Sequence, residues 1–219
     1  MRTVSGLLFV ALCLYVSMPE SRADTCGTTP GNVVLNCSFG TGDFTDWTVT
    51  GNDTPSEYDN LYGVELGQDP FDGIFPAGGS AYQAWFGDLD ANATTISQTF
   101  NTTIGATYDI SWFLAQDTKP DKTTDGGAYS NEFKASFGSA VLVNLTGMPV
   151  QGYTEYSYVV TATATTSALS FTLGNGLGEF LLDDVVVTPE PSSWVLMIVV
   201  AAGCVFLLRR KASRVVVAK

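Results

Sequence analysis

Residues 107–114 read Thr-Tyr-Asp-Ile-Ser-Trp-Phe-Leu. Successive side chains of an extended strand point to opposite faces, so Tyr108, Ile110, Trp112 and Leu114 share one face. All four are large and apolar or aromatic, whereas the residues between them are mixed. This period-two pattern predicts a β-strand with one buried face and places Trp112 in the core of the protein.

Similar short runs rich in Val, Thr, Tyr, Phe and Ile recur on both sides of this strand, between clusters of Gly, Asn, Asp and Pro. No stretch between residues 24 and 188 sustains a helical period. About eleven short strands at this spacing predict an all-β fold, an antiparallel β-sandwich of the jelly-roll type, with Trp47 also in its core. The predicted strands are Val33–Phe39, Trp47–Thr50, Leu61–Leu66, Ala81–Phe86, Thr94–Phe100, Thr107–Leu114, Glu132–Phe137, Val141–Leu145, Thr154–Thr163, Ala168–Leu173 and Phe180–Val187.

Composition excludes several classes of site. The chain has 219 residues, of which 15% are charged and 45% hydrophobic, so it has enough apolar surface to fold. It contains no histidine. A Ser-His-Asp triad, a Cys-His nucleophile pair and His-ligated zinc or haem are therefore excluded.

The predicted domain, residues 24–188, is strongly acidic. Twenty of the 22 acidic residues lie there, opposed by Lys119, Lys122 and Lys134, which gives a formal charge of −17. Such a field repels phosphates, so we expect no nucleic-acid partner. It favours solubility and attracts cations.

Residues 1–23 have the layout of a secretory signal peptide. Arg2 precedes an apolar run, Val4–Val16, and Ser21-Arg22-Ala23 places small residues before a cleavage point at Asp24. The alternative is an uncleaved anchor, although the run is shorter than the roughly 20 residues that a membrane span needs. We therefore expect the domain to be exported.

A second apolar segment, residues 194–208, predicts a short transmembrane helix near the C-terminus. Arg209 and Arg210 follow it, and residues 215–219 form a tail. Basic residues after a span mark its cytoplasmic side, so the acidic domain is expected outside the cytoplasm.

Pro189-Glu190-Pro191 stands directly before this helix. The order of Pro-Glu-Pro, a short apolar helix and a tail containing Arg209 and Arg210 resembles the PEP-CTERM sorting signal of bacterial surface proteins, over residues 189–214. The resemblance implies that these residues are recognised by an exosortase-type membrane transpeptidase. It also implies anchoring in the inner membrane, then transfer to the cell surface or the extracellular space. The alternative is a plain single-span anchor with a stiff linker.

Several short sequence segments between residues 32 and 188 resemble those of bacterial jelly-roll domains of the galactose-binding-like, carbohydrate-binding-module type. They are the opening run at residues 32–39, the Gly42–Trp47 turn, Ile96–Phe100 with Gly105–Tyr108 as a central hairpin, and Leu182-Asp183-Asp184-Val185 near the end. Many such domains carry a glutamate where this chain has Gly40. The resemblance implies a domain that binds a glycan without catalysis.

Two cysteines fall inside the exported domain, Cys26 and Cys37. An exported domain meets an oxidising compartment, so we predict a disulfide between them, with two free buried thiols as the alternative.

Asp183 and Asp184 point to opposite faces of a predicted strand, so one carboxylate is buried unless the strand is exposed on both sides. The resemblance implies a structural calcium ion at this position. Asp43 and the backbone carbonyls near it are further candidate ligands, since calcium takes six to eight oxygens. A hydrogen-bonded aspartate without metal is the alternative.

Aromatic residues near acidic loops suggest a site for an exopolysaccharide or another glycan, because aromatic faces stack on sugar rings and carboxylates accept hydroxyl protons. The candidates are Tyr58, Tyr62, Phe71 and Trp85. Packing in the core or in loops is the alternative for each. Two other functions compete: a purely structural envelope or matrix protein, and a carboxylate-based glycoside hydrolase. No pair of acids stands out, and we predict that the chain is not an enzyme.

Overall fold

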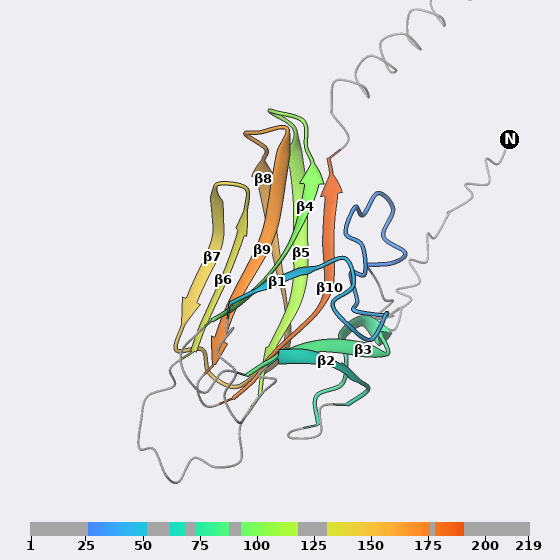
Figure 1. Cartoon of the computed structure of the whole chain (residues 1–219), viewed down its shortest axis with the longest axis vertical. Helices are drawn as coiled ribbons and strands as arrows, with labels where there is room; N and C mark the ends of the chain where they lie inside the picture. Colours follow the sequence, from blue (N-terminus) through green and yellow to red (C-terminus); the bar gives the residue numbers. More distant parts are fainter. Residues whose placement is uncertain are drawn as a thin grey trace, which may run out of the picture.

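The computed structural model describes residues 26–51, 62–68, 73–87, 93–117, 131–175 and 178–190. Within these ranges the chain forms two five-stranded antiparallel sheets that face each other (Figure 1). The elements are β1 (Thr48–Thr50), β2 (Tyr62–Leu66), the short 3₁₀ helix η1 (Ala77–Gly79), β3 (Tyr82–Phe86), β4 (Thr94–Asn101), β5 (Thr107–Gln116), β6 (Asn131–Phe137), β7 (Ala140–Thr146), β8 (Gln151–Thr161), β9 (Thr166–Asn175) and β10 (Phe180–Pro189).

The strand order confirms the predicted β-sandwich. The first sheet has the order β1-β4-β9-β6-β7, and the second has the order β2-β3-β10-β5-β8. From β3 to β10 the chain crosses between the sheets at every step except the β6–β7 hairpin. This gives the two interleaved four-strand sets, 4-9-6-7 and 3-10-5-8, of a jelly roll.

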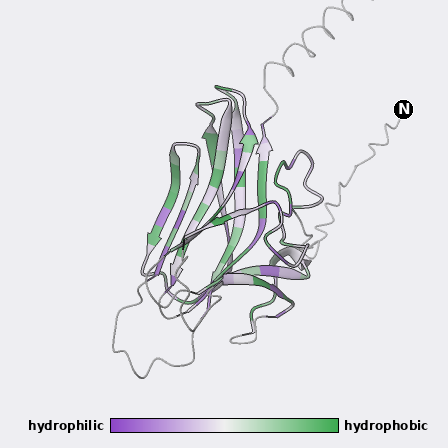
Figure 2. Cartoon of the chain, in the orientation of Figure 1, coloured by the Kyte–Doolittle hydropathy of each residue, from purple (hydrophilic) through white to green (hydrophobic). Residues whose placement is uncertain are grey.

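The alternation in β5 is confirmed. Tyr108, Ile110, Trp112 and Leu114 are all buried between the sheets, and the strands of Figure 2 carry bands of hydrophobic and hydrophilic residues. Trp112 lies at the centre, with its ring 5.1 Å from that of Phe171 in an edge-on contact. Aromatic pairs in this geometry add about 0.5–1.5 kcal/mol beyond their buried area.

Ten of the predicted strands are present, with ends shifted by up to three residues. The strand predicted at Val33–Phe39 is wrong. Asn36 and Phe39 have φ values of 46° and 53°, in the left-handed region that a strand does not adopt. The Phe39 amide donates to the Asn36 carbonyl at 3.1 Å and closes a turn. The apolar pattern that suggested a strand arises because Val34, Cys37 and Phe39 are buried from a looped backbone.

This N-terminal loop (residues 26–47) nevertheless occupies the place of a strand. Strand β3 pairs with β10 only as far as Leu182, which leaves the next part of that edge of β10 open. The Val33 amide donates to the Val187 carbonyl at 3.0 Å, and the Val185 amide donates to the Cys37 carbonyl at 2.9 Å. The open edge of β10 is thereby hydrogen-bonded by the loop, which runs beside it in Figure 1.

Strand β10 extends further than the sequence indicated. It runs to Pro189, which pairs with Tyr108, and the Glu190 amide then donates to the Thr107 carbonyl at 2.9 Å. The Thr107 hydroxyl also donates to the Glu190 carboxylate. The first residue of Pro-Glu-Pro therefore belongs to β10 and the second is hydrogen-bonded to β5, beyond the domain end expected at residue 188.

The remaining terminal features lie outside the described residues. These are the signal peptide at residues 1–23, Pro191, the helix expected at 194–208, Arg209, Arg210 and the tail at 215–219. In the part of the chain that the structure describes, no helix is both long and apolar enough to cross a membrane.

Candidate functional site

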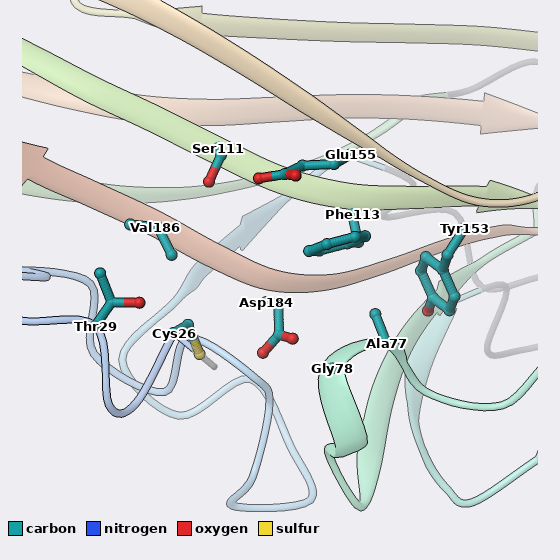
Figure 3. A pocket seen from close by; sticks show the side chains of 10 residues that line it. All are labelled: Cys26, Thr29, Ala77, Gly78, Ser111, Phe113, Tyr153, Glu155, Asp184 and Val186. Carbon is teal, nitrogen blue, oxygen red and sulfur yellow. The ribbon is translucent and has the colours of Figure 1, made fainter. Parts of the chain in front are cut away.

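A pocket of about 280 Å³ lies on the outer face of the second sheet (Figure 3). Strands β5, β8 and β10 form its floor, and the N-terminal loop and η1 form its walls. Ten residues line it: Cys26, Thr29, Ala77, Gly78, Ser111, Phe113, Tyr153, Glu155, Asp184 and Val186.

The floor follows from strand register. Phe113 of β5 pairs with Glu155 of β8 on one side and with Asp183 of β10 on the other. Ser111 lies two residues before Phe113, on the same outward face, and pairs with Val186. Paired residues on adjacent strands lie side by side, so an aromatic ring, a hydroxyl and a carboxylate meet on one surface. In Figure 3 the Phe113 ring is seen between the carboxyl groups of Glu155 and Asp184.

A β-bulge places Asp184 in the pocket wall. The register of β10 against β5 shifts between Asp183 and Val186, and Asp184 has a φ of 49°. Aspartate tolerates this left-handed conformation better than most residues. The Asp184 amide donates to Asp183 Oδ1 at 2.8 Å, within the bulge. Both carboxylate oxygens of Asp184 are buried in the wall, so Glu155 is the exposed carboxylate of the pocket.

The N-terminal wall is held by the predicted disulfide, which is confirmed between Cys26 and Cys37 with Cα atoms 5.8 Å apart. Asn32 fastens the same loop to β10. Its Nδ2 donates to the Cys26 carbonyl at 2.9 Å and to the Val185 carbonyl at 3.3 Å. Its Oδ1 accepts the Val187 amide at 2.9 Å. One carboxamide thus provides hydrogen bonds that a neighbouring strand would otherwise supply.

Tyr153 and Gln83 close the pocket at its other end. The Tyr153 hydroxyl donates to Gln83 Oε1 at 2.9 Å. Strands β5 and β10 lie between β8 and β3, so the two side chains meet above two intervening strands, across about 14 Å at about 4.8 Å per strand. Gln83 Nε2 in turn donates to Glu65 Oε1 at 2.6 Å and to the Ile74 carbonyl at 3.1 Å. These bonds fasten the segment before η1 to the sheet.

The candidate calcium ligands are not gathered into one set. Asp43 lies exposed on the N-terminal loop, where Oδ1 accepts the Thr41 hydroxyl at 2.7 Å and the Thr45 amide at 2.9 Å. Hydrogen bonds from Thr45 and Thr41 to the carboxylate hold the pKa of Asp43 below its usual range. Asp183 and Asp184 are buried on β10. Among the described residues, no three histidine, cysteine, aspartate or glutamate side chains are placed to hold one metal ion.

The aromatic residues predicted to contact a glycan do not line the pocket. Tyr58 and Phe71 lie outside the described residues. Tyr62 packs against the core, with its ring 5.9 Å from that of Phe44. Trp85 lies half-buried on β3 and covers Gly63, where a Cβ atom would come within 2.7 Å of the indole Nε1. A glycan-binding role for Trp85 stays a prediction.

Sequence reasoning missed the aromatic residues that do line the pocket, Phe113 and Tyr153. Phe113 stands at an outward position of a strand whose opposite face is the core. An aromatic residue at such a position indicates either a covering loop or a ligand. In Tyr153-Thr154-Glu155 an aromatic ring and a carboxylate share one face of β8, which is a further signal readable from the sequence.

No protein-family profile matches the chain, and no curated protein matches it. Several solved structures have similar folds. A family 61 carbohydrate-binding module in complex with β-1,4-galactotriose has a TM-score of 0.49 and 15% identity, over 73% of this chain and 99% of the other. The K3 cleaved adhesin domain of Lys-gingipain from Porphyromonas gingivalis has a TM-score of 0.47 and 18% identity, over 71% of this chain and 98% of the other. A family 4 carbohydrate-binding module has a TM-score of 0.38 and 16% identity, over 68% of this chain and 98% of the other. Similarity of this degree does not transfer a function to this chain.

Proposed function

We propose that the domain binds a glycan, without catalysis, in the pocket on the outer face of the second sheet. The observation that carries this proposal is the composition of the pocket. An aromatic floor at Phe113 and an aromatic end wall at Tyr153 stand beside the hydroxyl of Ser111 and the carboxylate of Glu155. Sugar rings present apolar C–H faces and hydroxyl edges, and this pocket offers a partner for each.

Size and rigidity support the same function. A volume of about 280 Å³ is just below the roughly 300–1,000 Å³ of small-molecule pockets, which suits one or two sugar units of a longer chain. A disulfide and the hydrogen bonds of Asn32 and Gln83 fix the walls. A pocket that is already formed loses little conformational entropy when a ligand binds.

Binding is favoured over glycoside hydrolysis because of the different exposure of the two carboxylates. A hydrolase of the two-carboxylate type needs both groups at the scissile bond, one as acid and the other as base or nucleophile. The oxygens of Asp184 are buried in the wall, which leaves Glu155 as the carboxylate that a ligand can reach.

The test is a glycan array probed with the purified full chain, followed by calorimetry on the best ligand. Replacing Phe113 by Ala should weaken binding about tenfold or more, because truncating an aromatic anchor of an interface costs about 1.4 kcal/mol or more. Trp85→Ala is the matched control, since it removes an aromatic ring from the same face of the sheet outside the pocket.

If Phe113→Ala keeps its glycan affinity and Trp85→Ala loses it, the glycan site lies at Trp85 and not in this pocket. If no glycan binds, the purely structural role in an envelope or matrix is favoured instead. Release of reducing ends during the assay would contradict the non-catalytic part of the proposal.

We propose further that this domain acts at the cell surface or in the extracellular matrix. The support is in the sequence: the signal-like residues 1–23, Pro189-Glu190-Pro191, the apolar segment 194–208, and Arg209 with Arg210. In this proposal an exosortase-type transpeptidase processes the anchored chain. Mass spectrometry of surface-located protein should lack peptides from Val195 to Arg209, and finding them intact would refute the proposed processing.

A further inference from the structure

Resting on the proposed glycan site, we infer that the pocket selects sugars that carry a free amine, that is, hexosamine units without an N-acetyl group. The starting point is the charge of its lining. Glu155 and Asp184 are the ionisable acids among the ten lining residues, and no lysine or arginine is among them. A ligand carboxylate or sulfate would meet the exposed carboxylate of Glu155 there and no basic side chain.

The charged residues around the pocket support the same negative potential. Within the described ranges the single basic residue is Lys134, on β6 of the opposite sheet. Its neighbours Phe133 and Ala135 face the core, so Lys134 points out from the far side of the sandwich. The exposed carboxylate of Glu155 therefore has no basic side chain of the described residues beside it. The field at the pocket mouth is therefore negative and attracts a cation.

The positions of the groups fit an aminated ring. Glu155 is exposed and lies beside Phe113, so a sugar stacked on the Phe113 ring brings its edge to the Glu155 carboxylate. An ammonium group at that edge makes a charge-assisted hydrogen bond, which is stronger than the bond from a hydroxyl. Phe113 and Tyr153 also favour a cation through their ring faces. An N-acetyl group replaces that charge by a bulkier neutral amide.

The experiment compares matched ligands on the full chain by calorimetry at low salt and about pH 5.5, where the sugar amine is protonated and an exposed glutamate is still ionised. The probes are glucosamine and galactosamine oligomers and their fully N-acetylated counterparts of equal length. We expect the free-amine form to bind about tenfold more tightly, about 1.4 kcal/mol. The preference should shrink at high salt, because Glu155 is exposed and its charge is screened.

Glu155→Gln keeps the shape of the side chain and removes the charge, so it should abolish the preference for the amine and change the affinity for the acetylated form by less than about threefold. Glu132→Gln is the matched control, since Glu132 is an exposed acid on β6 of the other sheet. It removes one negative charge, as Glu155→Gln does, and should leave the preference intact.

Equal affinity for amine and acetamide forms would overturn the inference and leave the glycan-binding proposal standing. An equal loss in Glu155→Gln and Glu132→Gln would assign the preference to the net charge of the domain and also overturn it. Failure of every sugar to bind would overturn both proposals.

Discussion

Asn32 fixes the N-terminal loop in place, although the residues beside it in the sequence are exposed. Its carboxamide joins the N-terminal loop to the free edge of β10 through the Cys26 carbonyl and the backbone of Val185 and Val187. It also accepts the Val34 amide at 3.1 Å. An alanine there leaves several backbone groups without their partner at once, each of which costs roughly 1–3 kcal/mol if it is buried and unsatisfied.

We therefore expect Asn32→Ala to lower the free energy of unfolding by about 2–3 kcal/mol. Chemical denaturation monitored by tryptophan fluorescence measures this directly. Asn144→Ala, at an exposed position of β7, is the control and should stay within about 0.5 kcal/mol of the parent. Equal effects of the two substitutions would show that the loop is not fastened through Asn32.

Asp43 gives a prediction of pH dependence. Its pKa is lowered by hydrogen bonds from Thr45 and Thr41, so the folded protein favours the charged carboxylate. The resulting stability is present above the ordinary pKa near about 4 and is lost as the pH falls through the lowered folded-state value. Asp43→Asn should melt at a lower temperature than the parent at neutral pH. The difference should shrink as the pH falls below about 4 and disappear once the pH is below the lowered folded-state pKa. A difference of constant size across this range would contradict the assignment.

At the scale of elements, sequence periodicity predicted most strands because each strand has one core face. The alternation in β5 and the position of Trp112 follow directly from that geometry. The segment at residues 33–39 misled the prediction, since turns can also bury every second or third apolar side chain. Nothing local in the sequence reports that Asn36 and Phe39 adopt positive φ values.

The disulfide turns this looped segment into a stable wall. We expect the double variant Cys26→Ser with Cys37→Ser to lose about 2–3 kcal/mol of stability, as for closure of a loop of this length. It should also bind glycan more weakly, because Cys26 lines the pocket. Stability is read from denaturation and affinity from calorimetry at a temperature where the variant is folded. Full glycan affinity in the folded variant would show that the loop keeps its place without the bond.

The end of β10 yields a separate prediction. Glu190 is held to Thr107 by a backbone hydrogen bond and by the Thr107 hydroxyl. Glu190→Gln keeps the shape and removes the charge, so we expect it to weaken this link by about 0.5–1.5 kcal/mol. The amide of Glu190 should then exchange its hydrogen faster, while amides in β9 stay protected. Uniform change across both strands would indicate global destabilisation instead of fraying at the Pro-Glu-Pro boundary.

At the scale of the whole molecule, the pocket could not be read from the sequence. Its ten lining residues come from the N-terminal loop, η1, β5, β8 and β10, which are far apart in the chain. They meet because the jelly-roll order places β10 between β3 and β5, and because Asn32 and Gln83 hold loops over that strand. The sequence predicted that aromatic residues near acids form the site, but the fold brings together a different pair, Phe113 and Tyr153, beside Glu155.

The net charge of the whole domain makes its stability depend on salt. A formal charge of −17 over residues 24–188 destabilises the compact state through self-repulsion, which salt screens. The melting temperature should therefore rise when sodium chloride increases from about 10 mM to about 300 mM, as the screening length falls from about 30 Å to below about 8 Å.

A structural calcium ion would act differently, because binding to the folded state alone stabilises it at concentrations too low to screen. Micromolar calcium should thus raise the melting temperature beyond sodium chloride of matched ionic strength if Asp183 or Asp184 ligates the ion, and Asp184→Asn should remove that increment. An identical response to both salts would leave the hydrogen-bonded, metal-free aspartate pair as the account of this bulge. A melting temperature that does not change with salt would contradict self-repulsion as a determinant of stability.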